Sequence, residues 1–511
     1  MSGTSASPPP LVRQGAALAR GTFFNTLAFL ASNLRGIFTF LVARLLGSAV
    51  LGTWGLAWAA TDLTSKLGTC GLDTSTITHV ARREAAGDLA GGRRIMRAAL
   101  LIGVGTSLVM AAAGFFFTEP IGRRFGQRPE LLRAIAITLL ALPGVALYRI
   151  SNAASRGKSV MHHDIYSRGL TESFGTAAAL LVAIALGARA LAPEFAAIAG
   201  TLASGLVAFV LARRLFAGTA TGHPAPGEVA SLIRDSLPIA FYDLLNIGVM
   251  QIDVIMLGLF VGRVPSVTLE TLGIYAAGVE AASGLRKVSQ AFNPIFIPMV
   301  ARHMAAGEIR EAEASYGYLA RWMLAVLLPA VAVFVLAGGA ILRIYGPTFA
   351  QGSAWIAIVG VACALNAFVG LGETILMVER PTVNLVNSAV ACAAVIAANL
   401  YLIPVYGPLG AAIGMVVPYT IHGALRGIEI SWIFGWRWPW RALVKPWLAA
   451  AAALPLALAL RVTTAGVPME VASAAIYVGG YLLAWRAIGL DPSDRAVLDH
   501  LLHRRRAVDA A

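Results

Sequence analysis

The segment LGTWGLAW at residues 51–58 returns, with changes, as LGIYAAGV at residues 272–279. A second segment, VARREAAGDL at 80–89, returns as VARHMAAGEI at 300–309, and the two repeats recur at nearly the same offset. One repeat alone would fit chance similarity between alanine-rich helices, but two repeats in the same order are typical of internal duplication. The sequence therefore predicts a protein built from two related halves.

The composition places both halves in a lipid bilayer. Hydrophobic residues make up 58% of the 511 residues, charged residues only 13%, and the mean hydropathy is +0.74. Soluble domains contain roughly 45–50% apolar and about 25% charged residues. Apolar runs of about 20 residues, each able to cross the hydrocarbon as a helix, occur about fourteen times. Their centres lie near Phe29, Trp58, Val104, Leu142, Ala179, Leu202, Met250, Gly284, Leu328, Val361, Ala394, Met415, Ala452 and Gly479.

The expected fold is an all-α integral membrane protein with about fourteen transmembrane helices, in two pseudo-symmetric six-helix bundles plus two accessory helices. An even number of spans separates the repeats, so the halves should share one orientation and enclose a cleft. A segment rich in Gly and Pro marks the boundary between them. The expected divisions are a disordered cytoplasmic tail (1–19), an N-terminal bundle (20–216), a linker (217–230), a C-terminal bundle (231–433), an accessory helix pair (434–490) and a cytoplasmic tail (491–511).

Basic residues give the orientation. They gather on alternate connections, which the positive-inside bias assigns to the cytoplasm, and both termini then lie on that side. The connections expected there carry, among others, Arg82, Arg83, Arg93, Arg94, Arg149 and Arg156. Anionic lipid and topology account for the net charge of +14, so nucleic acid is not an expected partner. Phosphate-binding and metal-binding motifs are missing, and we expect neither a cofactor, nor a metal site, nor an enzyme.

Ionisable residues inside the spans are the candidates for function, because each is costly in lipid and usually faces a bundle interior or a watery cavity. In the first span, Asn25 and Arg35 fall on one helical face. In the second span, Asp62 and Lys66 stand four residues apart and can pair.

The eighth span is the most polar. Glu280, Lys287 and Gln290 follow one face, and Arg286 and Asn293 belong to an adjoining face that also includes Gln290. Such a helix can hardly face lipid, so we expect these side chains to line the interior.

The repeat offset aligns Lys66 with Arg286 or Lys287, so each half contributes a cation beside the expected cleft. Guanidinium and ammonium groups in a dry cavity bind phosphate oxygens strongly, which favours an anionic substrate. The alternative is that Lys66 only neutralises Asp62 and Lys287 only neutralises Glu280, as structural pairs.

Carboxylates in the spans are candidates for ion coupling. In the seventh span Asp253 has no basic residue one turn away, and a lone buried carboxylate tends to take up a proton or a cation. Glu280, Glu373 and Asp62 belong to the same group. Pairing with a cation on another helix is an equally good interpretation for Asp253 and Glu373.

Three stretches resemble the Wzx-like polysaccharide flippases, or polysaccharide biosynthesis proteins, of the multidrug, oligosaccharidyl-lipid and polysaccharide exporter superfamily. They are ARLLGSAVLGTWGLAW (43–58), PIAFYDLLNIGVMQIDVIMLGLFVG (238–262) followed by GIYAAG (273–278), and ANLYLIPVYGPLGAAIGMVV (398–417). The third is the most specific. With the number of spans, the resemblance covers nearly the whole chain.

The resemblance implies a flippase of the bacterial inner membrane. Its substrate would be an undecaprenyl-diphosphate-linked oligosaccharide for O-antigen, capsule or exopolysaccharide biosynthesis, moved by alternating access, with a polysaccharide polymerase complex and membrane lipids as partners. The side chains expected to bind this substrate are Arg35, Lys66, Arg286, Lys287, Asn25, Gln290 and Asn293.

Three alternatives stay open. A lipid II flippase and a drug/cation antiporter share the superfamily, although proton-type antiporters resemble one another in an acidic residue of the first span, where this chain has Arg35. A membrane polysaccharide polymerase or ligase is a different class, and it would be expected to have a long outer loop. None of the expected outer connections is long.

Overall fold

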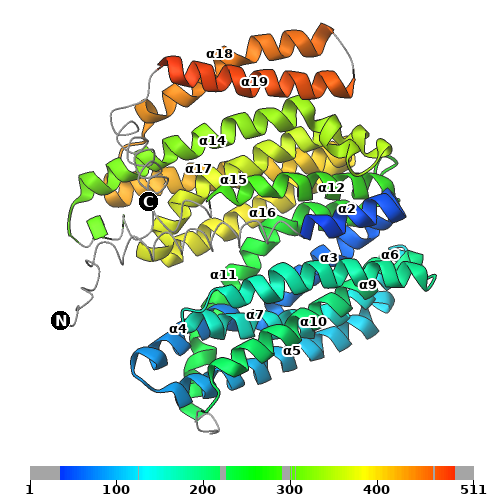
Figure 1. The fold of residues 1–511 in the computed structure, drawn as a ribbon, viewed down its shortest axis with the longest axis vertical. Coiled ribbons are helices and arrows are strands. Elements are labelled where there is room, and N and C mark those ends of the chain that lie inside the picture. Colours follow the sequence, from blue (N-terminus) through cyan, green and yellow to red (C-terminus); the bar gives the residue numbers. More distant parts are fainter. Residues whose placement is uncertain are drawn as a thin grey trace, which may run out of the picture. The chain divides into compact units, whose positions relative to one another are not determined.

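The computed structural model describes residues 35–124, 126–218, 226–289, 300, 302–304, 306–463 and 466–488 (Figure 1). These ranges are helical with short connections and contain no β-strand, which agrees with the expected all-α class. The elements are α2 (Arg35–Leu46), α3 (Ser48–Thr69), α4 (Leu72–Ala85), α5 (Leu89–Arg124), α6 (Pro129–Thr138), η1 (Leu139–Ala141), α7 (Leu142–Gly157), α8 (His162–Asp164), η2 (Ile165–Glu172), α9 (Ser173–Ala185), η3 (Arg189–Leu191), α10 (Ala192–Leu215), α11 (Pro226–Leu259), α12 (Leu269–Arg286), α14 (Ile309–Arg343), η4 (Pro347–Gly352), α15 (Ser353–Glu379), α16 (Pro381–Tyr406), α17 (Pro408–Phe434), α18 (Trp440–Thr463) and α19 (Val467–Ile488).

Ten helices of the described part are long and apolar enough to cross a membrane, so the protein is a multi-pass membrane protein. They coincide with ten of the expected centres. The centres near Trp58, Ala179 and Gly284 are also helical but do not reach that length and apolarity. The centre near Phe29 lies outside the described residues. The expected number of fourteen and the pseudo-symmetry stay predictions.

The chain divides into two compact units. The first consists of residues 1–284 and 382–418, and the second of residues 285–381 and 419–511. This division differs from the expected bundles, because α11 and most of α12 belong to the first unit rather than to a C-terminal bundle at 231–433. The expected domain bounds, the linker at 217–230 included, stay predictions. Contacts of α11 with α3 and α4 explain the difference.

Helices α3 and α4 are separated by a sharp break at two left-handed residues. Cys70 has φ of 48° and Gly71 has φ of 72°, and the Cys70 N–H closes α3 by donating to the Lys66 carbonyl. A side chain at Gly71 would collide with the α11 backbone at Ser236. Only glycine tolerates both this conformation and the close approach of the α11 backbone. Gly71 therefore fixes the position of the break where α11 crosses it.

The repeated segments meet at their glycines in the first unit. A methyl group on Gly52 of α3 would collide with the Leu269 carbonyl, and one on Gly273 of α12 would collide with the Ser48 carbonyl. Membrane helices approach most closely where small residues face each other, because lipid offers no hydrophobic drive for association. The Leu-Gly pair that the two repeats share is thus a helix crossing point.

The turn in the most specific family-like stretch has a simple cause. Gly407 adopts φ of 59° and its N–H donates to the Ile403 carbonyl at 2.8 Å, which ends α16. Pro408 then begins α17, where its missing N–H and fixed φ suit the first helical position.

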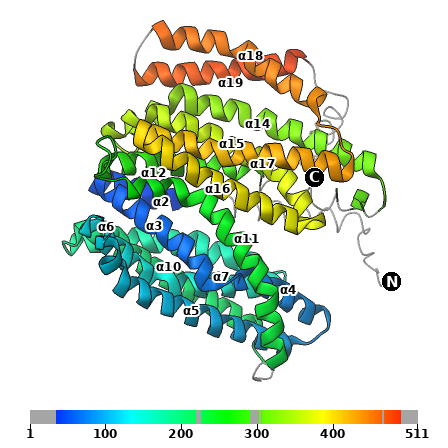
Figure 2. The ribbon, with the colours of Figure 1, turned by 180° about the vertical axis from the view of Figure 1, so that it is seen from behind.

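In the second unit, α18 and α19 form an antiparallel pair against α14, and Figures 1 and 2 both show the pair side by side. Helix α14 is kinked at Ala337, whose φ and ψ of −118° and 20° are not helical. The Ala340 N–H donates instead to Oε2 of Glu470 on α19, at 2.6 Å. This side-chain acceptor stabilises the kink.

Candidate functional site

Helix α11 runs beside α3, α4 and α5 within the first unit (Figure 2). A row of polar contacts joins α11 to these three helices, and we refer to it as the α11 seam. Its members on α11 are Glu228, Asp235, Ser236, Asp243 and Gln251. They recur about every seven or eight residues, which is two helical turns, so they share one face. That face of α11 is polar along most of its length.

Lys66 occupies the middle of the seam. Its Nζ donates to Asp243 Oδ2 at 2.7 Å and to Asp73 Oδ2 at 3.1 Å. The three side chains are 17%, 19% and 10% exposed, respectively. The break at Cys70 lets Lys66, in the last turn of α3, meet Asp73, in the first turn of α4. One ammonium is thus shared by two carboxylates.

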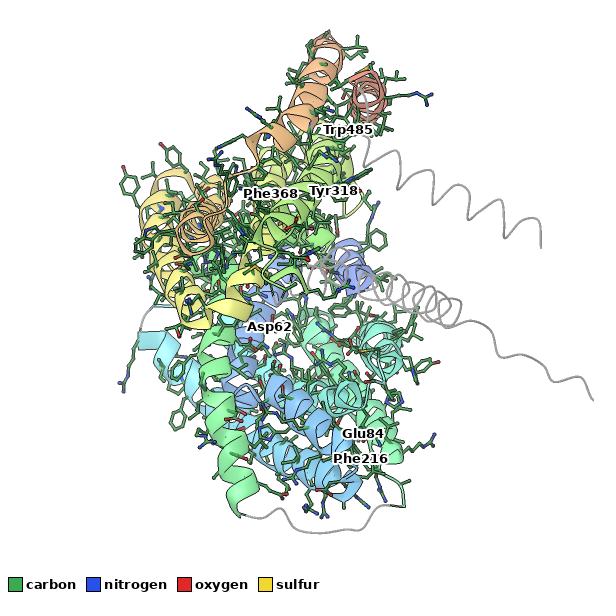
Figure 3. The ribbon with its side chains drawn as sticks, turned by 90° about the vertical axis from the view of Figure 1, so that its left-hand side faces the viewer. Asp62, Glu84, Phe216, Tyr318, Phe368 and Trp485 are labelled. Atoms are coloured by element: carbon green, nitrogen blue, oxygen red, sulfur yellow. The ribbon has the colours of Figure 1, made fainter. Side chains whose placement is uncertain are left out.

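Asp62 lies within the bundle one turn before Lys66, and Figure 3 labels it there. Arg149 Nη2 donates to Asp62 Oδ1 at 2.8 Å, and Gln251 Nε2 donates to Asp62 Oδ2 at 3.1 Å. The expected contact of Asp62 with Lys66 is replaced by these partners. The charge pattern predicted that Arg149 lies in a cytoplasmic connection. In the structure it lies in α7, inside the candidate span 129–157. Pairing with Asp62 makes its position in the bundle tolerable.

Two atoms of this group retain binding capacity. Arg149 Nη1 and Asp73 Oδ1 are buried and have no hydrogen-bond partner within the described ranges, and neither have the Thr69 and Thr76 hydroxyl groups. Buried polar atoms are normally satisfied. Arg149 can therefore donate a further hydrogen bond to an anionic oxygen, and Asp73 can accept one.

The seam continues toward one end of the unit through weaker pairs. The hydroxyls of Ser75 and Ser236 share a hydrogen bond, and His79 Nε2 lies 3.1 Å from Asp235 Oδ2. Ser75 and His79 are four residues apart on α4, which places both on the face toward α11.

An ion cluster closes the seam at this end. Glu228 Oε1 accepts from Arg83 at 3.0 Å and from Arg94 at 3.1 Å. Arg83 also donates to Asp88, and the Gly91 N–H, 2.7 Å from Asp88 Oδ1, is the main reason that the pKa of Asp88 lies below its ordinary value. The α11 N-terminal region is thus attached to α4 and α5 by charges.

A second cluster at the same end involves α7 and α10. Lys158 Nζ lies 3.5 Å from Glu84 Oε2 of α4 and 4.9 Å from the ring centroid of Phe216. Glu84 and Phe216 are labelled at this end of the unit in Figure 3, well apart from Asp62. Basic residues of the two clusters occupy the side that the charge pattern assigns to the cytoplasm.

The remaining expected ion-coupling residues lie elsewhere. Asp253 is 1% exposed and accepts a hydrogen bond from the Tyr275 hydroxyl at 2.6 Å. Glu280 is partly buried on α12. In the second unit, Glu373 pairs with Arg426 at 3.2 Å, as the interpretation of a structural pair anticipated.

The remaining expected substrate-binding residues divide into two groups. Arg286 and Lys287 are half-buried at the end of α12 and belong to the second unit. Asn25, Gln290 and Asn293 lie outside the described residues, as does the side chain of Arg35, whose backbone begins α2.

Sequence reasoning missed Asp73, Asp243 and Arg149 as site residues. The regular spacing of polar residues on α11 was a usable signal for Asp243. No sequence signal revealed that Asp73 meets Lys66, because this contact requires the break at Cys70.

Solved structures with similar folds are membrane transporters. A lipid II flippase, MurJ, in an inward closed conformation superimposes with a TM-score of 0.68 at 11% identity, covering 90% of this chain and 98% of that one. An inward-facing multidrug resistance transporter of the MATE family, in the MOP superfamily, gives 0.66 at 15% identity, with 80% and 94% covered. The Vibrio cholerae MATE transporter VcmN gives 0.55 at 18% identity, with 84% and 97% covered. These similarities establish the fold.

No curated protein sequence matches the chain. A family model described as "Polysaccharide biosynthesis protein" matches residues 18–304, more than half of the chain. That range contains the whole α11 seam and both copies of the Leu-Gly repeat. The chain belongs to the polysaccharide biosynthesis protein family.

Proposed function

We propose that the protein is a flippase that moves a polyprenyl-diphosphate-linked oligosaccharide from the inner to the outer leaflet of the bacterial inner membrane by alternating access. Membership of the polysaccharide biosynthesis family carries this proposal. The fold similarity to a structure described as a lipid II flippase supports it. The glycan would serve an O-antigen, a capsule or an exopolysaccharide, and a polymerase complex would receive it.

The diphosphate is the part of the substrate that the charges suit. Arg35, Arg286 and Lys287 supply cations that a diphosphate would bind through charge-assisted hydrogen bonds. Lys66 is already bonded to two carboxylates, so a phosphate must compete with Asp243 and Asp73 for it. Competition of this kind weakens binding and favours release, which a transporter needs at the end of each cycle.

Arg149 is an additional candidate in the first unit. Its Nη2 is committed to Asp62, but its buried Nη1 is available to an oxygen of the substrate. Asn25, Gln290 and Asn293 would then contact the sugars through hydrogen bonds. Asp253, Glu280, Glu373 and Asp62 are the proposed ion-coupling residues.

The experiment is a flipping assay in proteoliposomes with a fluorescent polyprenyl-diphosphate oligosaccharide. We expect protein-dependent movement of this lipid and little movement of lipid II or of a cationic drug in parallel assays. Faster movement of lipid II, or uptake of the drug alone, would assign the protein to another branch of the superfamily.

Variants test the role of the cations. Arg35→Ala combined with Arg286→Ala should lower the flipping rate about tenfold or more, because a hydrogen bond to a charged group contributes roughly 1.5–3 kcal/mol. Arg234→Ala is the matched control, since its side chain is 81% exposed on α11. Equal rates in the double variant and the control would remove the diphosphate-binding role while leaving the flippase assignment intact.

A further inference from the structure

Glu194 is a fully buried carboxyl group in the first unit. It is 0% exposed, near the start of α10, inside the candidate span 189–215. Neither Oε1 nor Oε2 has a hydrogen-bond partner, and the part of the chain that the structure describes offers it no ion pair. The sequence gives no hint of this, because Ala-Pro-Glu is an ordinary helix beginning, where an acidic residue is common.

The surroundings of Glu194 are apolar. Helix α10 contacts α7, α9, η2, α6, η1, α8 and η3, and the antiparallel course of α9 places η2 and α8, which precede it, beside the later turns of α10. Gly200 of α10 abuts Thr176 of α9, and the antiparallel course of the two helices brings the start of α10 toward the buried Leu180 and Ala183. Thr138, at the end of α6, has its hydroxyl committed to the Ala134 carbonyl.

The charged side chains on these elements do not neutralise Glu194. Arg133 on α6 and Arg189 on η3 are both exposed, and α9 and η1 contain no charged residue. Arg149 on α7 is bonded to Asp62. On η2, Arg168 is exposed, and on α8, Asp164 accepts from Asn152 and His163 contacts Ser155. Glu130, the remaining acidic residue of α6, is exposed.

Four other carboxylates of the helical region differ from Glu194 in this respect. Asp62 and Asp73 have cationic partners in the seam, Glu373 has Arg426, and Asp253 accepts from a tyrosine hydroxyl. An isolated carboxylate without water or a partner is so unfavourable that it takes up a proton instead.

We propose that Glu194 is a proton-binding site of the first unit, occupied as a neutral carboxylic acid in this conformation. The proton is the ligand, and the apolar contacts of α6, α9 and α10 select it over larger cations, which would need several oxygen ligands. The side chain lies in the first turn of α10, whose N-terminal dipole favours a negative charge. Opening of this region to water would therefore allow the proton to leave.

Only the role of the bound proton rests on the proposed transport function, because a proton that binds and leaves during alternating access can drive a flippase. The binding of the proton itself is independent of the substrate.

A hydrophobic carbodiimide provides the test, because it reacts with protonated carboxyl groups in apolar surroundings. The acid proton passes to a carbodiimide nitrogen and a carboxyl oxygen adds to the central carbon. Rearrangement gives a stable N-acylurea, nothing leaves, and the peptide gains the mass of one carbodiimide.

We expect dicyclohexylcarbodiimide to modify Glu194 in the purified full-length protein in detergent at neutral pH, as detected by peptide mass spectrometry. E194Q should lose the modification of this peptide. Glu130 is the matched control, because it also follows a proline in the first turn of a helix but is exposed; E130Q should leave the labelling of Glu194 unchanged.

Infrared spectroscopy gives a second measurement that does not depend on reagent access. The wild-type protein should show the C=O stretch of a protonated carboxylic acid, and the difference spectrum against E194Q should contain that band. Spectra of the two proteins that superimpose in this region overturn the proposal. A flipping assay separates this proposal from the proposed function. If the protein flips its substrate but the band is missing, only the proton site is wrong. If the protein does not flip the substrate but shows the band, only the proposed function is wrong.

Discussion

The α11 seam and the start of α10 differ in how they accommodate buried carboxyl groups. Both hold carboxyl groups inside the first unit, away from water. In the seam, Asp73 and Asp243 both accept from the Lys66 ammonium, at 3.1 and 2.7 Å. At the start of α10, Glu194 has no such partner in the described residues and, on our proposal, is neutral. The comparison teaches that a cationic partner, rather than the depth of burial, distinguishes the two kinds of carboxyl site in this bundle.

Of the substitutions that test this comparison, removal of the Lys66 ammonium should lower the free energy of unfolding most. Lys66→Met leaves two carboxylates close together without a cation, and breaking a buried ion pair costs about 3–5 kcal/mol. We expect this loss in the free energy of unfolding, measured by denaturant titration in detergent micelles. Lys66→Arg should retain most of the stability. A loss below about 1 kcal/mol for Lys66→Met would show that the middle of the seam is hydrated.

Asp62→Asn should come next. The amide can still accept from Gln251, but Arg149 loses its anionic partner, and an unsatisfied buried group costs about 1–3 kcal/mol. Adding Arg149→Met to Asp62→Asn should restore part of the stability, since no uncompensated charge then remains. If the double variant is less stable than the sum of the two single variants, the two residues do not act as a pair.

The end of the seam should respond weakly and depend on salt. Glu228→Gln removes the shared acceptor of Arg83 and Arg94, whose side chains are 39% and 25% exposed. Partly exposed ion pairs contribute about 0–1 kcal/mol. The difference in unfolding free energy between this variant and the wild type should shrink as the salt concentration rises, whereas the Lys66→Met difference should not.

Glu194→Gln should have the smallest effect. An amide is neutral and has nearly the shape of a carboxylic acid, so we expect a change of less than about 1 kcal/mol in unfolding free energy. Arg133→Gln, on the exposed face of α6, is the control. A loss as large as that of Lys66→Met would mean that Glu194 is ionised and has a cationic partner, which would erase the difference between the two regions.

Much of the fold was accessible from the sequence. Runs of apolar residues gave the helices, because only a helix satisfies its backbone hydrogen bonds in lipid. The turn at Gly407 and Pro408 lies within the stretch 398–417 that carries the family resemblance. The division into units was not accessible, since it depends on the side on which α11 packs, and the apolar pattern is the same for either side.

The candidate site was accessible only in part. Lys66 and Asp62 were identified by their charge within a span, but their partners come from helices distant in the sequence. Arg149 looked like a loop residue because basic residues usually flank spans. Glu194 went unnoticed because burial at a helix start results from how α6 and α9 cover it, and composition does not report this.

The hydrogen bond from Ala340 to Glu470 bears on how the chain can be shortened. Deletion of α18 and α19 would remove apolar surface and would also strip an amide of α14 of its acceptor, in a stretch where the helix no longer supplies one. A derivative of this protein that lacks α18 and α19 would thus need a compensating change near residue 340, such as a sequence that lets α14 run straight. The terminal hairpin is therefore part of what holds the bend of α14, and a shortened chain has to replace that support.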